Sequence, residues 1–182
     1  MRVAILGRGN VGGGLARLWE KAGHEVSAFG KDGGDAGTAE VLVVAVPSGF
    51  IKDAFAKVTG FEGKAAIDAT NAFGGRDQSF PSLAHEVKSI TGGPVAKAFN
   101  VNFATVYDDV ASQRTRPSNL WCGDDEVREI AEQLSRDGGY EPVAAGSLGN
   151  ARALEEFVMP FAAASESAGG PLLYRFAGPG EL

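Results

Sequence analysis

The 182-residue sequence is 44% hydrophobic, which is enough for one domain with a hydrophobic core, with or without a small appendage. Its net charge of −6 argues against a nucleic-acid surface, because phosphate binding needs clustered Lys and Arg. The single cysteine, Cys122, cannot form an internal disulfide, which favours the cytoplasm, and no apolar stretch reaches the about 20 residues that span a bilayer.

The N-terminal residues predict a strand, a glycine turn and a helix. Residues 3–6 are a short apolar run typical of a buried strand in a parallel sheet, rather than of a signal peptide. The turn then has the spacing Gly-x-Gly-x-x-Gly: Gly7 permits the turn, Gly9 admits a pyrophosphate and Gly12 lets helix and strand pack closely. Strand, turn and helix together predict dinucleotide binding. The predicted cofactor-binding residues here are Gly7, Arg8, Gly9, Asn10, Val11 and Gly12.

The residues after the second predicted strand bear on the choice of cofactor. Enzymes that prefer NAD usually place an acid there for the ribose 2′-OH, whereas a basic residue accommodates the 2′-phosphate of NADP. Here Gly30 and Lys31 follow the strand, and Arg8 could reach the same phosphate, so the sequence favours NADP. Asp32 and Asp35 count against this choice because either could swing in, and Lys31 could instead be a solvated loop charge.

The remaining elements alternate between strands and helices. This predicts a Rossmann-like, doubly wound α/β fold whose mainly parallel sheet is covered on both faces. Residues 30–39 are too few and too glycine-rich for a crossover helix, so we expect a loop or one helical turn and an open, mobile adenine side. The predicted strands are 3–6, 24–29, 40–46, 64–69, 95–99, 120–122 and 141–145. The predicted helices are 10–22, 49–58, 82–90, 125–137 and Ser147 to about Pro160, with a helical turn and a polar loop over 103–118.

The order of these elements also suggests how the chain is organised. We interpret residues 1–118 as a dinucleotide-binding Rossmann domain and residues 119–182 as a C-terminal α/β extension packed on the same sheet. The turn of Val46, Pro47 and Ser48 follows a buried strand, at the edge where open α/β sheets bind ligands, so we predict that these three residues bind the cofactor.

Six segments form a recognisable set in order along the chain. They are GRGNVG at 7–12, AVP at 45–47, DATN at 68–71, KAFN at 97–100, CGD at 122–124 and PVAAGSL at 142–148. Together they resemble the NADP oxidoreductases that depend on the deazaflavin coenzyme F-420, and the related cytosolic reductase domain of the six-transmembrane metalloreductases.

The resemblance implies positions for both ends of the cofactor. Gly30 and Lys31 would form the 2′-phosphate platform, where the family usually has a small polar residue and Arg. Asn100 stands where a family His contacts the deazaflavin. The nicotinamide would lie near the ends of strands three to five, at Val46, Pro47, Thr70, Asn71, Phe99 and Asn100.

The sequence offers no evident catalytic acid, base or nucleophile and no His/Cys cluster with metal-ligand spacing, so we predict neither catalytic nor metal-binding residues. Hydride transfer between a nicotinamide and a flavin-like ring is consistent with the lack of catalytic side chains, because the cofactors carry the chemistry. We therefore expect an NADPH-dependent oxidoreductase with NADP(H) as cofactor and coenzyme F-420 or a flavin as small-molecule acceptor. No nucleic-acid or membrane partner is expected.

Two other functions remain open at this point. The chain could be a non-catalytic NADP(H)-binding sensor or regulatory module, or a carbonyl reductase with Tyr107 or Tyr140 as proton donor. The apolar C-terminal helix could supply a homodimer interface or pack on its own sheet; its apolar residues are Leu154, Phe157, Val158 and Phe161.

Overall fold

The computed structural model describes residues 1–180. Its strands are β1 (Arg2–Leu6), β2 (Glu25–Phe29), β3 (Gly34–Asp35), β4 (Val41–Val44), β5 (Val58–Thr59), β6 (Ala65–Asp68), β7 (Val95–Ala98), β8 (Ser118–Gly123) and β9 (Glu141–Ala144). Its α-helices are α1 (Asn10–Lys21), α2 (Ile51–Phe55), α3 (Leu83–Thr91), α4 (Arg128–Asp137) and α5 (Ala151–Ser167). Its 3-10 helices are η1 (Ser48–Phe50), η2 (Ala72–Gly74), η3 (Ala104–Ser112), η4 (Asp125–Val127) and η5 (Leu148–Asn150).

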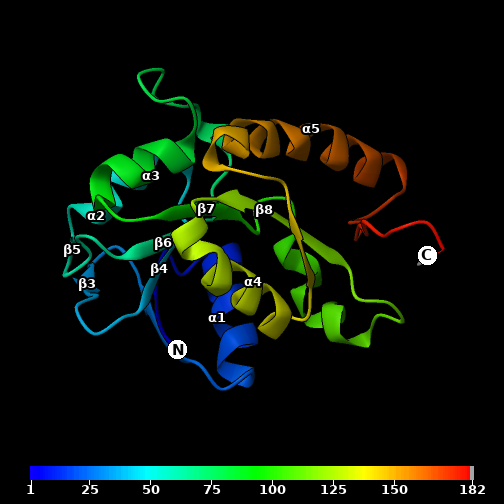
Figure 1. Ribbon diagram of the computed structural model, residues 1–182, viewed down its shortest axis with the longest axis horizontal. Helices are drawn as coiled ribbons and strands as arrows, with labels where there is room; N and C mark the ends of the chain where they lie inside the picture. Colours follow the sequence, from blue (N-terminus) through cyan, green and yellow to red (C-terminus); the bar gives the residue numbers. More distant parts are fainter. Residues whose placement is uncertain (181–182) are drawn as a thin grey trace.

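The main sheet has seven strands in the order β2-β1-β4-β6-β7-β8-β9. Every neighbouring pair is parallel except β7 and β8, so β8 and β9 run opposite to the other strands. The helices α1 and α4 cover one face, and α3 and α5 cover the other (Figure 1). This is the Rossmann-like α/β fold with a mainly parallel sheet that the sequence predicts, and β8 and β9 continue the same sheet beyond β7.

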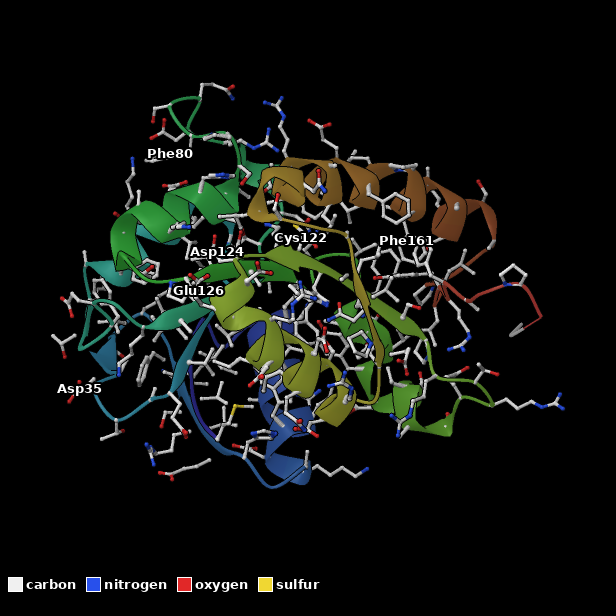
Figure 2. All side chains as sticks on the ribbon, in the orientation of Figure 1. Asp35, Phe80, Cys122, Asp124, Glu126 and Phe161 are labelled. Atoms are coloured by element: carbon white, nitrogen blue, oxygen red, sulfur yellow. The ribbon has the colours of Figure 1, made fainter. Side chains whose placement is uncertain are left out.

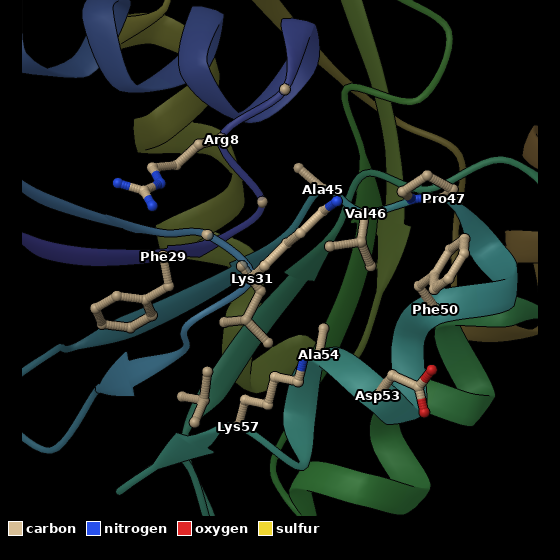
Figure 3. Close-up of a pocket in the computed structure, with 15 residues that line it drawn as sticks. Arg8, Phe29, Lys31, Ala45, Val46, Pro47, Phe50, Asp53, Ala54 and Lys57 are labelled. Carbon is tan, nitrogen blue, oxygen red and sulfur yellow. The ribbon is translucent and has the colours of Figure 1, made fainter.

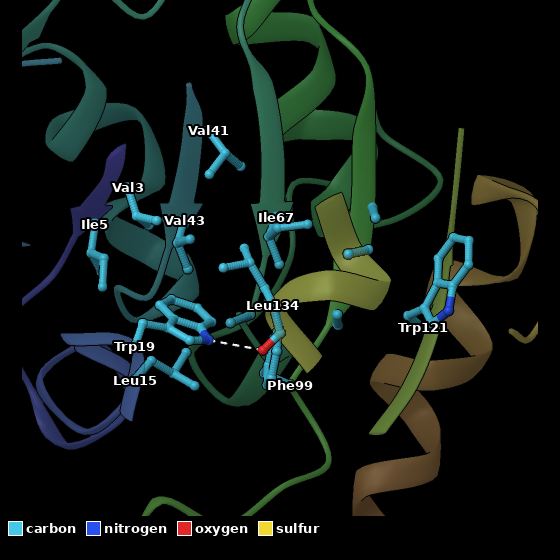
Figure 4. Packing of buried hydrophobic residues seen from close by; sticks show 14 of the residues in the cluster. Val3, Ile5, Leu15, Trp19, Val41, Val43, Ile67, Phe99, Trp121 and Leu134 are labelled. Carbon is cyan, nitrogen blue, oxygen red and sulfur yellow. Dashed lines mark hydrogen bonds between the residues drawn. The ribbon is translucent and has the colours of Figure 1, made fainter. Parts of the chain in front are cut away.

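Each face of the sheet packs against its own hydrophobic core. On the α1 side the fully buried Trp19 donates its indole N–H to the carbonyl of Leu134 in α4 at 2.9 Å (Figure 4). The ring of Phe99 meets Trp19 edge-on, with centroids 5.4 Å apart. On the other side, Ile51 of α2 and Leu154 of α5 belong to the second core. Burial on both faces explains why β1 and β4 read as continuous apolar runs.

The connection between β2 and β4 is not the plain loop that we expected. It contains β3, which pairs in parallel with β5 through Gly34 opposite Val58 and Asp35 opposite Thr59. The helix predicted over 49–58 is accordingly wrong, because the chain forms η1 and α2, leaves the helix after Phe55 and uses residues 58–59 as a strand. Two-residue strands have no detectable alternation, so sequence periodicity does not indicate them.

The last helix is longer than predicted, because α5 continues through Pro160 to Ser167. A proline inside a helix removes one hydrogen bond, but the buried face of α5 extends beyond it. The ring of Phe161 stacks on Phe103, with centroids 5.2 Å apart, and Ser165 Oγ donates to the Phe161 carbonyl at 3.0 Å. Figure 2 shows Phe161 on the inner side of the helix. Packing therefore carries the helix past the proline.

The apolar face of α5 is largely covered within the chain itself, because Leu154, Val158 and Phe161 are buried. Of the two roles considered for this helix, a homodimer interface or packing within its own chain, these three side chains take the second. None of the helices in residues 1–180 has the length and apolarity needed to cross a bilayer.

Candidate functional site

The glycine turn after β1 has the geometry that its spacing predicts. Gly7 has a φ of +119° and donates its N–H to the carbonyl of Phe29 at 2.9 Å, which ties the turn to the end of β2. A Cβ at Gly12 would collide with the carbonyl of Gly7, so helix and turn meet backbone to backbone. A Cβ at Gly9 would have no neighbour within 4 Å, so the space above this residue is open to a ligand.

The N-terminus of α1 faces the same space. The helix begins at Asn10 after Gly9, without a capping side chain and without an acidic residue in its first turn. The first N–H groups of an α-helix have no intrahelical partner, and here they belong to Asn10, Val11 and Gly12. Unpaired amides and the positive end of the helix dipole favour an anion at this position.

A cavity of about 630 Å³ lies beside this turn, at the carboxyl ends of β1, β2 and β4 (Figure 3). It brings together the predicted site residues Gly7, Arg8, Gly9, Gly30, Lys31, Val46 and Pro47. Ser48, predicted with them, does not line this cavity and instead lines a smaller one next to η2. Sequence reasoning missed the lining residues Phe29, Phe50, Asp53, Ala54, Lys57 and Val58. The missed residues of α2 and β5 line the wall opposite the turn, where no motif marks them.

Three cationic side chains line this cavity. Arg8 lies over Gly30, whose missing side chain leaves room for the guanidinium. Lys31 extends across the cavity towards Val46, and Lys57 points in beside α2 (Figure 3). Within residues 1–180 none of these three side chains has a hydrogen bond or an ion pair. The cavity lining therefore has more positive than negative charge, since its three cations face a single acid, Asp53.

Asp32 and Asp35, the two acids that could have bound the ribose 2′-OH of NAD at the end of β2, do not line the cavity. Asp35 accepts hydrogen bonds from the Gly37 N–H at 2.8 Å and from Thr59 Oγ1 at 3.3 Å, which hold it against β5. Asp32 is exposed in the turn between β2 and β3. Among the lining residues the only acid is Asp53, which comes from α2.

The predicted nicotinamide residues beyond the cavity are largely engaged with one another. Asn71 Nδ2 donates to the Asn100 carbonyl at 2.6 Å, and Asn100 Nδ2 donates to Asn71 Oδ1 at 3.0 Å. Asn100 also donates to the carbonyl of Leu154 at 2.9 Å. These amides fasten the ends of β6 and β7 to each other and to α5, so they position the site without lining the cavity of Figure 3.

Thr70 and Phe99 likewise turn their side chains inward. The Thr70 hydroxyl donates to Asp68 Oδ1 at 2.6 Å. Phe99 has a φ of +62°, which a bulky residue rarely adopts, and its ring lies in the core between Trp19 and Tyr140. Phe99 can therefore reach a ligand only through its backbone.

Beneath these strand ends lies a buried cluster of charges that sequence reasoning missed. Lys97 Nζ lies 2.7 Å from Asp68 Oδ2 and 3.2 Å from Glu155 Oε1. It also donates to the Thr70 carbonyl at 2.6 Å. Arg76 donates to Glu155 Oε2 through Nε at 3.0 Å and Nη2 at 2.7 Å. Two cations thus meet two anions, and only the tertiary fold brings α5 to this place.

The remaining reactive side chains have structural roles. His24 Nε2 lies 2.8 Å from Asp137 Oδ2, and His85 Nδ1 lies 2.7 Å from the Ser82 hydroxyl that caps α3. Burial raises the pKa of the Cys122 thiol to about 12. No group of residues within 1–180 could hold a metal ion.

The tyrosines needed by a carbonyl reductase lie in the core instead of at the cavity. Tyr107 and Tyr140 are fully buried, and desolvation raises the pKa of both phenols far above the usual value of 10.0. Neither lines the cavity beside the glycine turn. This arrangement removes them as proton donors to a substrate there.

Comparison with protein-family models and with curated proteins finds no match. Among solved structures, a protein from Arthrobacter sp. FB24, provisionally described as an F-420-dependent NADP-reductase, superposes with a TM-score of 0.82 at 20% identity. That comparison covers 98% of this chain and 100% of the other. A hypothetical protein from Sinorhizobium meliloti gives 0.65 at 24% identity, over 81% and 85% of the chains.

Longer reductases share the fold as well. A reductive aminase from Aspergillus terreus, solved with NADPH and ethyl levulinate, superposes with a TM-score of 0.65 at 13% identity. The comparison covers 92% of this chain but only 62% of the aminase. At these identities the comparisons show that the fold is shared.

Proposed function

We propose that this protein is an NADPH-dependent oxidoreductase that passes hydride between NADP(H) and a deazaflavin or flavin acceptor. The observation that carries the proposal is the cavity beside the glycine turn, where bare helix amides and unpaired cations meet at the carboxyl edge of a parallel sheet. That edge is where open α/β sheets bind nucleotides.

The residues present fit a dinucleotide diphosphate. The open space above Gly9 allows a phosphate to approach the backbone, and the amides of Asn10, Val11 and Gly12 are available to hold it. Bound there, the cofactor would supply a nicotinamide ring that gives or takes a hydride.

The choice of NADP(H) over NAD(H) follows from the charges at the end of β2. Arg8 and Lys31 offer donors to a 2′-phosphate, and both are unpaired in the described chain. An NAD-type site would need an acid for the ribose hydroxyl, but Asp35 is held by Gly37 and Thr59. The NADPH bound by the longer aminase is in keeping with this choice.

A flavin-like acceptor agrees with the lack of a buried acid among the residues that line the cofactor cavity, where the only acid, Asp53, is exposed. Reducing a carbonyl needs a proton donor for the carbonyl oxygen. The buried phenols of Tyr107 and Tyr140 cannot reach a substrate carbonyl in the cavity. Two stacked rings need chiefly alignment, which a preformed cavity supplies. The description of the Arthrobacter protein points to the same class of acceptor.

Titration with both nicotinamide cofactors, followed by acceptor assays, tests the proposal. NADPH should bind more tightly than NADH in a fluorescence titration. NADPH should then be consumed when coenzyme F-420, FMN or FAD is added, as followed in its absorbance band. Absence of NADPH binding would refute the cofactor assignment, and binding without turnover of any acceptor would refute the reaction.

One observation favours a second candidate, a non-catalytic NADP(H) sensor. Asn71 and Asn100, implied as contacts at the nicotinamide end, bond to each other and leave few free donors for an acceptor. A sensor would bind NADPH tightly, turn over no acceptor and co-purify with a fixed partner, whereas the oxidoreductase would consume NADPH by itself.

A further inference from the structure

A second, smaller cavity of about 360 Å³ adjoins the wall of the cofactor cavity. It lies between η1, η2 and the first turn of α3. Consecutive residues of the 46–50 turn divide between the two spaces: Pro47 lines the larger cavity and Ser48 lines the smaller one. This turn therefore contributes to the walls of both cavities.

Two polar groups in the smaller cavity have no partner. Ser48 is 6% exposed, and its hydroxyl makes no hydrogen bond within the described chain. Glu86 is 5% exposed, and its carboxyl has no hydrogen bond or ion pair among residues 1–180. A buried polar group without a partner is unfavourable unless it has a use or a guest.

Several charged side chains near Glu86 affect its protonation. Lys52 of α2 is paired with Asp77 at 2.8 Å, and Arg76 is paired with Glu155, so neither cation neutralises Glu86. Burial raises the pKa of Glu86 above its usual 4.5, Asp77 and Asp68 raise it further, and Lys52 lowers it by less than burial raises it. The carboxyl therefore keeps its proton at higher pH than an exposed glutamate does.

Asp53 lines the cofactor cavity but is exposed, and the other acidic groups near the strand ends are paired or lie in the core. Asp68 and Glu155 are held by Lys97 in the buried charge cluster. The phenols of Tyr107 and Tyr140 lie in the core on the α1 side of the sheet. Glu86 is thus the buried acid that has no partner and faces a cavity at this edge.

We propose that Glu86 is the proton source for the reduction of the acceptor, and that the Ser48 hydroxyl passes this proton from the smaller cavity towards the cofactor cavity. This inference rests on the proposed oxidoreductase function. NADPH supplies two electrons and one hydrogen as hydride and leaves as NADP⁺, so the acceptor needs one further proton. Ser48 gives its proton to the reduced acceptor and takes one from Glu86, directly or through water in the cavity. Glu86 is then reprotonated from solvent, and in the reverse direction it accepts the proton.

The carboxyl itself can be observed without turnover. Infrared spectra of the wild type minus Glu86→Gln should show a protonated-carboxyl band that persists to higher pH than that of an exposed glutamate, and the band should disappear as pH rises through the raised pKa. The matched variant Glu62→Gln changes an exposed glutamate in the same way and should give no such band. Absence of the band in wild type above pH 4.5 would overturn the proposal.

Turnover provides the second measurement, with NADPH as donor and coenzyme F-420 or FMN as acceptor. Glu86→Gln should lower kcat about 100-fold and flatten its pH profile, as expected for removing a general acid. Glu86→Asp keeps a carboxyl and should keep the pH dependence, and Ser48→Ala should slow kcat with the carboxyl band intact. NADPH affinity should stay unchanged in the two Glu86 variants.

The outcomes separate this inference from the proposed function. Wild-type turnover together with unchanged kcat and pH profile in Glu86→Gln would overturn the proton role and leave the oxidoreductase standing. Wild-type protein that turns over neither acceptor would overturn both. If Glu86→Gln does not fold, the proposal stands or falls on Ser48→Ala and Glu86→Asp.

Discussion

Lys97 and Asp68 form an ion pair of 2.7 Å between two side chains that are fully buried. Glu155 of α5 completes the arrangement, since its Oε1 lies 3.2 Å from Lys97 Nζ and also accepts the N–H of Leu83 at 2.9 Å. One ammonium group thus joins β6, β7 and α5 beneath the strand ends.

Removing the cation should be strongly destabilising. Lys97→Met leaves Asp68 and part of Glu155 uncompensated in the interior, so the free energy of unfolding should fall by about 3–5 kcal/mol. Urea unfolding measures the change. Lys88→Met, which removes a half-exposed cation paired with Asp124, should lose only about 0–1 kcal/mol. Equal losses in the two variants would contradict the special role of the buried pair.

Lys31→Ala should weaken NADPH binding about 5- to 100-fold, the equivalent of about 1–3 kcal/mol for a hydrogen bond to a charged group. NADH binding should barely change, because NADH lacks the 2′-phosphate. Fluorescence titration with both cofactors measures the effect, and Arg8→Ala should show the same selectivity. Lys21→Ala, an exposed cation at the other end of α1, serves as control. Equal losses for NADPH and NADH would show that Lys31 does not read the 2′-phosphate.

Two glycines of the turn should separate folding from binding. A Cβ at Gly9 meets nothing within 4 Å, so Gly9→Ala should leave the free energy of unfolding within about 0.5 kcal/mol and still weaken NADPH binding. Gly12→Ala places its Cβ against the Gly7 carbonyl and should destabilise the protein. Urea unfolding and NADPH titration of both variants test this contrast. Loss of stability in Gly9→Ala with unchanged NADPH affinity would contradict it.

Cys122 should be inert in the folded protein. Its pKa of about 12 leaves very little thiolate at pH 8, and the side chain is fully buried between the sheet and α5 (Figure 2). Ellman's reagent should therefore react slowly at pH 8 and quickly once urea unfolds the chain. Rapid reaction of the native protein would place the thiol at the surface instead.

Much of the fold can be predicted from the sequence because the patterns that indicate it are local. Continuous apolar runs indicate the buried strands, and the glycine spacing indicates the turn, since both patterns are set by neighbouring residues. The same locality explains why Gly30 and Lys31 could be placed beside Gly7 and Arg8: parallel strands end at one edge.

The parts that the sequence does not reveal depend on distant contacts. The pairing of residues 34–35 with 58–59 joins two segments too short to have a pattern. Phe99 reads as a strand-end residue near the cofactor, but its positive φ turns the ring into the core. The second cavity, with Glu86 on α3 and Ser48 after β4, likewise exists only once these elements pack together.

Glu155 lies in the C-terminal portion of the chain, residues 119–182, and its carboxylate is needed by the N-terminal portion. Its carboxylate neutralises Arg76 and helps to neutralise Lys97, both of which lie on the other side of residue 118. A polypeptide ended at that position would leave Arg76 without its partner and Lys97 with Asp68 alone, and it would uncover the apolar cores that α4 and α5 cover. Such a fragment should therefore aggregate instead of forming a minimal nucleotide-binding unit. A nucleotide-binding module taken from this protein for engineering should therefore include residues 119–182.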